Sequence, residues 1–258
     1  MSCSGIIYLI MENKGNVDDI SFTESSRQPP FSLREAYGIS EKCKLSFQRA
    51  IIDWYNKNRR SYTWQTGSDP YKIIVAEIML QKTNADRVAR IYSQFMQRFP
   101  DAVALGCSEL EELKLILKPL GLDYRAARLK DMARRLVTKY NGEVPVSEGK
   151  LLTLPGVGRY IANAVLCFAY SSRVPLVDIN VVRLYERVFS LRSDKGRARE
   201  DPKIWEFATE MMPMNGFRKY NRALIDFGAE ICMSKNPRCD KCTVSFICNY
   251  SSGQYGGN

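Results

Sequence analysis

The chain has 258 residues, of which 45% are apolar and 26% charged, a composition typical of a globular protein. It contains no histidine, which excludes histidine as a general base or metal ligand, and it has no apolar run long enough to span a membrane. The net charge of +10 favours a polyanionic partner, most simply nucleic acid, over a merely solvated basic surface.

Helical periodicity runs through most of the chain. Residues 1–43 show no clear repeat and are expected to form an N-terminal extension. Helical spacing of apolar residues begins near Lys44, and the next helix is expected within residues 69–83, with Asp69 as N-cap and Pro70 in the first position. Because no stretch alternates with period two, we predict an all-α protein with short connections. Further helices are expected at about 84–98, 109–118, 124–140, 147–154, 158–171, 179–190, 202–212 and 219–231.

The stretch LPGVGRY, Leu154 to Tyr160, places two glycines between two predicted helices. Gly156 and Gly158 permit positive φ and the close approach of another backbone. A helix N-terminus presents N–H groups that suit an anion such as a DNA phosphate. A plain turn between two helices explains the glycines equally well, so both interpretations stay open at this point.

Four of the eight cysteines lie within residues 232–248, and only Cys239 and Cys242 form the close pair typical of a zinc ribbon. The looser outer spacings favour an iron–sulfur cluster held by four thiolates. Disulfides are disfavoured because the other cysteines are scattered along a chain without a secretion signal. Nearby basic residues would let this loop meet DNA phosphates, namely Lys235, Arg238 and Lys241.

Taken together, these motifs make the chain resemble the endonuclease III superfamily of helix–hairpin–helix DNA glycosylases with a C-terminal iron–sulfur loop. The resemblance runs from about Phe47 to Cys248 and also includes VDINVVR at residues 177–183. The family fold implies two all-α lobes with a DNA-binding cleft between them. The expected domains are an N-terminal extension at 1–43, a six-helix lobe with the helix–hairpin–helix at 68–172, a cluster lobe at 44–67 and 173–250, and a flexible tail at 251–258.

The resemblance makes Asp178 the catalytic residue. From the sequence alone Asp178 caps the following helix, and a capped carboxylate near a helix dipole stays ionised. Such a carboxylate can stabilise the oxocarbenium character that develops at C1′ and orient the attacking water. Glu77 lies in an otherwise apolar helix, so it either forms a structural ion pair or acts on the flipped base by proton donation or hydrogen bonding.

The resemblance also implies a set of DNA contacts, because the target base must leave the duplex before its bond is cut. The family places residues that wedge into the opened stack at four positions of this chain, for which surface or packing roles are the alternative. The implied DNA-binding residues are Gln81, Lys82, Leu122, Tyr124, Gly156, Val157, Gly158, Arg159 and Asn180. The implied [4Fe–4S] ligands are Cys232, Cys239, Cys242 and Cys248.

Tyr160, which we also place in the catalytic set, takes the position of the lysine that forms a Schiff base in the endonuclease III branch. Tyrosine cannot form one, so a monofunctional glycosylase is expected. Two branches share this tyrosine: one removes adenine opposite oxidised guanine, and the other removes thymine or uracil opposite guanine. Since the sequence ends at Asn258, the adenine branch's usual C-terminal domain is expected to be missing, and Lys82 and Ile179 replace that branch's usual glutamine and glycine. Ile179 fits the usual small residue of neither branch.

We therefore expect a monofunctional DNA glycosylase of base excision repair that removes thymine or uracil mispaired with guanine. The alternatives are an adenine DNA glycosylase and a non-catalytic DNA-binding relative that keeps the cluster as a scaffold. The joint presence of Asp178 and Glu77 speaks against the non-catalytic alternative. The expected partner is double-stranded DNA with a mismatched or damaged base, without a membrane partner. The protein is expected to be a monomer in the cytoplasm, associated with the nucleoid.

Overall fold

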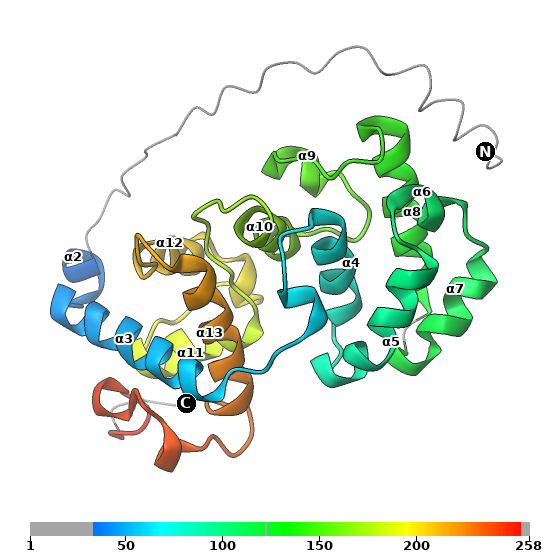
Figure 1. Ribbon diagram of the computed structural model, residues 1–258. Helices are drawn as coiled ribbons and strands as arrows, with labels where there is room; N and C mark the ends of the chain where they lie inside the picture. The colour runs from blue at the N-terminus through cyan, green and yellow to red at the C-terminus, as the bar shows by residue number, and fades with distance from the viewer. Residues whose placement is uncertain (1–32, 122, 254–258) are drawn as a thin grey trace. The chain divides into compact units, whose positions relative to one another are not determined.

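The computed structural model describes residues 33–121 and 123–253 (Figure 1). Within these residues every regular element is a helix, which confirms the predicted all-α class. None of the helices described there is long and apolar enough to cross a membrane. The described residues fall into two compact units, one comprising residues 61–172 and the other residues 33–60 together with 173–253.

The unit of residues 61–172 is built around α4, most of whose side chains are buried and which packs against α10. The Asp69 carboxylate starts α4 as predicted, by accepting hydrogen bonds from the backbone N–H groups of Tyr71 at 3.0 Å and Lys72 at 3.2 Å. The helices of this unit are α4 (Pro70–Leu80), α5 (Ala85–Arg98), α6 (Ala102–Cys107), α7 (Leu110–Leu117), α8 (Tyr124–Tyr140), α9 (Glu148–Leu152) and α10 (Arg159–Phe168).

Helix α6 is an addition to the helices expected from periodicity. Its six residues are too few to show an apolar repeat. The signal that starts it is local, because the Asp101 carboxylate accepts a hydrogen bond from the Ala104 N–H at 2.8 Å. The other helices of this unit lie within a few residues of their predicted bounds.

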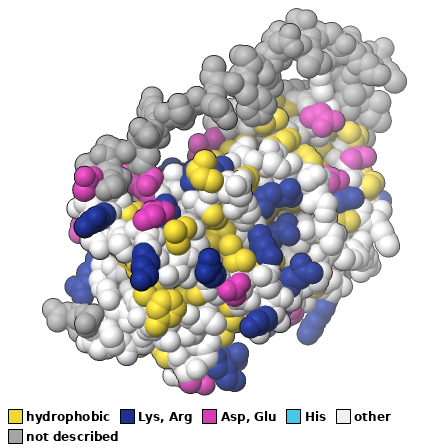
Figure 2. Space-filling view, turned by 60° about the vertical axis from the view of Figure 1, so that its left-hand side comes forward, with side chains coloured by type: hydrophobic (Ala, Val, Ile, Leu, Met, Phe, Trp, Pro, Cys, Tyr) yellow, Lys and Arg dark blue, Asp and Glu magenta, His cyan; other side chains and the backbone are white. Residues whose placement is uncertain are grey.

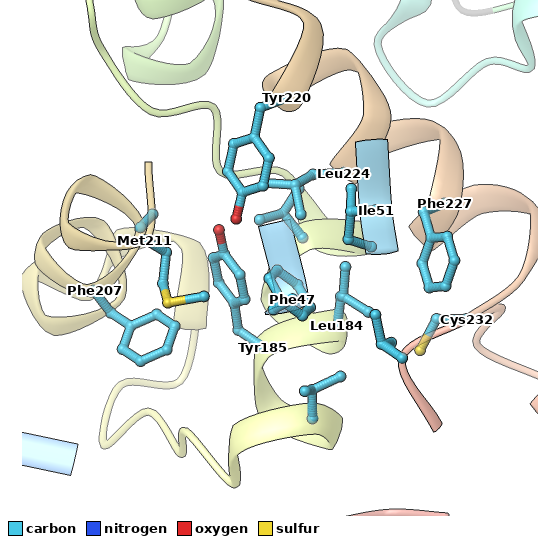
Figure 3. Close-up of a cluster of buried hydrophobic side chains, with 14 of the residues drawn as sticks. Phe47, Ile51, Leu184, Tyr185, Phe207, Met211, Tyr220, Leu224, Phe227 and Cys232 are labelled. Carbon is cyan, nitrogen blue, oxygen red and sulfur yellow. The ribbon is translucent and has the colours of Figure 1, made fainter. Parts of the chain in front are cut away.

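The second unit has an aromatic core formed by α3, α11, α12 and α13 (Figure 3). The rings of Tyr185 and Phe207 meet edge to face at 5.0 Å, as do those of Trp54 and Phe227. This core fixes α11, the helix that follows Asp178. The elements of this unit are α2 (Leu33–Tyr37), α3 (Glu41–Asn58), α11 (Ile179–Phe189), α12 (Pro202–Glu210), α13 (Phe217–Glu230) and the short turns η3 (Ala198–Glu200), η4 (Cys239–Lys241) and η5 (Ser245–Ile247).

The helical part of this unit begins before the boundary expected at residue 43. Leu33 and Ile39 are buried in the core, and Ser40 caps α3 by accepting a hydrogen bond from the Cys43 N–H at 3.2 Å. The five-residue helix α2 is too short to produce a readable period, which explains why the sequence pattern does not reveal it.

Candidate functional site

The glycine turn joins α9 to α10, and its two glycines have different roles. Gly156 adopts φ of +82°, and a Cβ there would lie 3.3 Å from Cδ of Arg128. Gly158 has φ of −99°, so the predicted positive φ holds for Gly156 alone. Gly158 is the N-cap of α10 without a side-chain cap, and a Cβ added there would meet no atom within 4 Å. Gly158 itself is exposed.

Of the residues in this turn and the start of α10, some are buried in the core and others lie at the surface. Val157 is buried, and its N–H donates to the Leu154 carbonyl at 3.1 Å. The Val157 side chain therefore anchors the turn in the core, and its DNA contact stays a prediction. Arg159 is exposed, with its Nε 3.8 Å from Oε1 of Glu148. Tyr160 is partly buried in the first turn of α10.

The turn at residues 81–83 lies against the glycine turn. Nε2 of Gln81 donates to the Gly156 carbonyl at 2.9 Å, and its Oε1 accepts from Arg128 at 3.3 Å. The Gln81 side chain, predicted to enter DNA, is thus bonded within the protein in this structure. Lys82 is exposed and left-handed, with φ of +54°. These contacts tie two of the predicted DNA-binding segments together.

Tyr124 begins α8 and is exposed, and the Arg128 guanidinium lies 4.4 Å from its ring centroid. Leu122, the other predicted wedge residue of this stretch, lies outside the described residues. Glu77 is buried on α4 with 8% of its surface exposed. This burial withdraws the Glu77 carboxylate from bulk water. A buried charge is costly unless it has a partner.

Asp178 lies in the other unit as the N-cap of α11, as predicted. Its Oδ1 accepts hydrogen bonds from the N–H groups of Asn180 at 2.9 Å and Val181 at 2.8 Å. Its Oδ2 accepts from the side-chain amide of Asn180 at 2.7 Å. Burial raises the pKa of Asp178 above its usual value, and these hydrogen bonds oppose that rise. The carboxylate is only partly exposed and is held in one orientation.

A second layer of contacts fixes Asn180, which was predicted to bind DNA. Its Oδ1 accepts from Nη2 of Arg183 at 2.9 Å. Arg183 also donates to the carbonyls of Cys232 at 2.7 Å and Gly228 at 2.6 Å. Both ends of the Asn180 amide are therefore used within this unit, in support of Asp178, and its DNA contact stays a prediction. Arg183 is absent from the predicted site residues, although its i,i+3 spacing from Asn180 puts the two on one helix face.

The cysteine loop is bound to the same helix. Arg187 of α11 donates to the Met233 carbonyl at 2.7 Å and to Sγ of Cys232 at 3.6 Å. Within the described residues, no three acidic, cysteine or histidine side chains form a site for a single metal ion. Burial raises the pKa of the Cys232 thiol and brings that of Cys242 to about 11. The four cysteines line one cavity together with Leu184, Arg187, Val188, Ile231, Pro237, Arg238, Val244, Tyr250 and Ser251.

Basic side chains recur over the face shown in Figure 2, with apolar side chains exposed among them. Among the described residues of the whole chain, exposed apolar side chains include Ile179, at 63% and next to Asp178 in the sequence, and Phe246, at 65% in the cysteine loop. A mixture of positive charge and apolar surface suits contact with phosphates and bases.

Comparison with known proteins identifies the family of this chain. Residues 75–209 match the family described as the HhH-GPD superfamily of base excision DNA repair proteins. The chain belongs to this superfamily. The predicted kinship with helix–hairpin–helix glycosylases is thereby confirmed.

Individual HhH-GPD relatives resemble the chain over most of its length. A thymine-DNA glycosylase of Aeropyrum pernix is 36% identical over 209 residues, covering 80% of this chain and 94% of the relative. An adenine DNA glycosylase of Buchnera aphidicola is 33% identical, covering 79% of this chain and 58% of the relative. The solved structure of a thermostable thymine-DNA glycosylase superimposes with a TM-score of 0.77 at 34% identity, covering 82% of this chain and 98% of that one.

Proposed function

We propose that this chain is a monofunctional DNA glycosylase that removes thymine or uracil paired with guanine. The observation that carries the reaction type is Asp178, a partly exposed carboxylate fixed by three hydrogen bonds at the start of α11. The choice of base is supported by similarity to the thymine-DNA glycosylase of Aeropyrum pernix and to the thermostable thymine-DNA glycosylase of known structure.

In the proposed reaction, water forms a bond to C1′ of the deoxyribose as the bond from C1′ to the base breaks. The base leaves with the bonding electron pair and takes up a proton, and an abasic site remains. Asp178 in its ionised form stabilises the positive charge at C1′ and accepts a hydrogen bond from the attacking water. Its three hydrogen bonds keep the carboxylate in place, so little reorganisation is needed during the reaction.

We also propose roles for two residues of the unit of residues 61–172. Glu77 hydrogen-bonds or protonates the flipped base, a role that suits a carboxylate withdrawn from bulk water. Tyr160 contacts the flipped nucleotide with its ring. Tyr160 supplies no primary amine, so no Schiff base with the sugar forms at this position.

The glycine turn is the proposed phosphate grip. The N-terminus of α10 carries the positive end of the helix dipole, and the space in front of Gly158 admits a ligand oxygen. The exposed side chain of Arg159 adds positive charge beside it. A grip of this kind positions DNA without reading its sequence.

We also propose that Cys232, Cys239, Cys242 and Cys248 hold a [4Fe–4S] cluster. The proposal is supported by four thiols that line one cavity with mostly apolar side chains, a donor set of the kind that holds iron–sulfur clusters. When bound, the cluster supplies a cross-link for the loop that is anchored on α11. Iron, sulfide and zinc analysis, with visible absorbance, tests this proposal. Zinc in place of iron would refute it.

A cysteine variant and its control separate cluster binding from general stability. Cys239→Ala should lower the iron content and the melting temperature together. Cys167→Ala, which changes a buried cysteine of the other unit, should leave the iron content unchanged.

The function itself is tested with duplexes that contain thymine, uracil or adenine opposite guanine or oxidised guanine. Released bases are separated by chromatography, and the DNA is analysed on gels with and without alkali. We expect thymine and uracil to be released opposite guanine, and strand breaks to appear only after alkali. Release of adenine without any pyrimidine would overturn the proposed substrate, and breaks without alkali would overturn the monofunctional mechanism.

A further inference from the structure

Arg125, in the first turn of α8, has the largest of the fully buried side chains. It forms no ion pair within the described part of the chain, and its Nε has no hydrogen-bond partner there. Burial lowers the pKa of Arg125, yet an arginine remains charged in proteins. Burying a cation without a carboxylate is a poor way to stabilise a fold, which points to a role beyond packing.

The guanidinium instead joins two turns that are far apart in the sequence. Its Nη2 donates to the Gln81 carbonyl and to the Thr83 hydroxyl, the latter at 2.5 Å. Its Nη1 donates to the Leu120 carbonyl at 3.3 Å. One planar fork therefore spans the turn after α4 and the turn before α8, a geometry that a lysine cannot reproduce.

Both turns contain backbone with positive φ, and the turn at Lys82 needs support. Lys82 has φ of +54°, and Gly121 has φ of +68°. A lysine rarely adopts this left-handed conformation unless its surroundings hold it there. Exposed side chains border both turns, Lys82 in the first and Tyr124 after the second. The Gln81 side chain extends the connection to the Gly156 carbonyl of the glycine turn.

We propose that Arg125 is a positioning residue that holds the 81–83 turn and the start of α8 at a fixed spacing, so that Lys82 and Tyr124 enter the base stack together. The inference rests on the proposed function, because an enzyme that opens a duplex needs the side chains that enter the base stack to be held at a fixed distance from each other. Wedges that are already ordered avoid the entropy cost of ordering at the moment of insertion.

The test compares Arg125→Lys with Arg134→Lys, a change on the same helix at an arginine whose Nε bonds the Gly106 carbonyl at 3.2 Å. Base opening is followed by the fluorescence of 2-aminopurine beside a G·T mismatch, alongside duplex affinity, melting temperature and single-turnover base release. We expect Arg125→Lys to keep duplex affinity within about threefold while base opening and release fall by at least about tenfold, since small misplacements cost up to about a hundredfold. Arg134→Lys should leave all of these at the wild-type level.

A purely structural role makes a different prediction. If Arg125→Lys lowers the melting temperature, and duplex affinity falls by the same factor as base opening, the residue only supports the fold and the proposal fails. Thr83→Val is a milder second variant, because it removes one acceptor of the fork and leaves the arginine in place. It should reduce base opening without changing duplex affinity, and wild-type opening in this variant would also overturn the proposal.

Base opening and base release are separate readouts, which keeps this inference distinct from the proposed function. A wild-type protein that opens the mismatch without releasing a pyrimidine contradicts the proposed function. Loss of that opening in Arg125→Lys would still support the positioning role.

Discussion

The N-cap residues of α10 and α11 have nearly the same backbone conformation, but one has no side chain and the other has a carboxylate. Gly158 before α10 has φ and ψ of −99° and −179°, and Asp178 before α11 has −99° and −177°. Both helices then run into the core of their own unit. Gly158 leaves the positive helix end open to an outside anion, whereas Asp178 provides an anion of its own.

This difference shows how one local structure serves two purposes. A helix start without a side-chain cap suits DNA phosphate binding, while a helix start capped by a partly exposed carboxylate suits stabilisation of positive charge on a sugar. Because the two N-caps have the same backbone conformation, the identity of the N-cap residue should decide the function of each helix start. Four predictions test this idea, beginning with the largest expected effect.

Asp178→Asn should lower the rate of base release by about a thousandfold, or about 4 kcal/mol of transition-state stabilisation. Asparagine is as good an N-cap as aspartate, so α11 and the binding of duplex DNA should be retained. Single-turnover kinetics and DNA titration measure the two effects. Asp201→Asn is the matched control, because Asp201 caps α12 through the Lys203 N–H at 3.0 Å and has no proposed catalytic role. Base release that survives in Asp178→Asn would refute the catalytic assignment.

Gly158→Asp gives α10 the cap that α11 already has. The added carboxylate should leave folding stability equal or slightly higher, but its charge should weaken duplex binding about tenfold to a hundredfold. Gly158→Asn separates the effect of the N-cap hydrogen bond from that of the negative charge, because it adds a neutral cap of the same size. Unchanged duplex affinity in Gly158→Asp would show that the α10 N-terminus is not the phosphate grip.

Gly228→Ala tests how tightly the start of α11 is held. A Cβ at this position would lie 2.8 Å from Cβ and 3.0 Å from the backbone oxygen of Asn180. We expect a loss of about 1–3 kcal/mol in the free energy of unfolding, because overpacked backbone relaxes poorly. Gly149→Ala in α9 is the control, since its nearest atom is 3.9 Å away and alanine should stabilise the helix by about 0.5–1 kcal/mol. Equal stability of the two variants would contradict the tight contact.

The smallest effect concerns pH and folding stability. Burial raises the folded-state pKa of Asp178, so the ionised form is less favourable in the folded protein than in the unfolded chain. The resulting penalty is absent at pH values below the unfolded pKa and appears as pH rises through the folded pKa. The difference in stability between Asp178→Asn and the wild type, measured by denaturant unfolding, should therefore shift in favour of Asp178→Asn as pH rises from about 3 to neutral. A stability gain at acid pH alone would contradict this sign.

Much of the architecture is predictable from local signals in the sequence. The caps at Asp69 and Asp178 fix where α4 and α11 begin, and both are visible as an acidic residue before an apolar helical repeat. Helices α2 and α6 are not expected from periodicity, whereas the equally short α9 is. Leu33 of α2 is held in the core of its unit, and α6 begins at the Asp101 cap.

The candidate site is less predictable, because side-chain contacts between distant segments leave little trace in one sequence. Val157 belongs to the predicted DNA-binding motif, and its place in the sequence does not reveal that its side chain is buried. The bonds from Arg125 to Gln81 and from Arg183 to Cys232 join residues that are 44 and 49 positions apart. A pattern of spacing identifies the motif, but only the folded chain reveals which residues hold it in place.

The central claim is that the start of α10 binds DNA and the start of α11 performs the chemistry. One measurement tests it directly: the single-turnover rate of thymine release from a G·T duplex, at increasing protein concentration, for the wild type, Gly158→Asp and Asp178→Asn. We predict that Gly158→Asp raises the concentration for half-maximal rate and keeps the maximal rate. Asp178→Asn should lower the maximal rate and keep the half-maximal concentration. A change in the same parameter for both variants would contradict this division of roles.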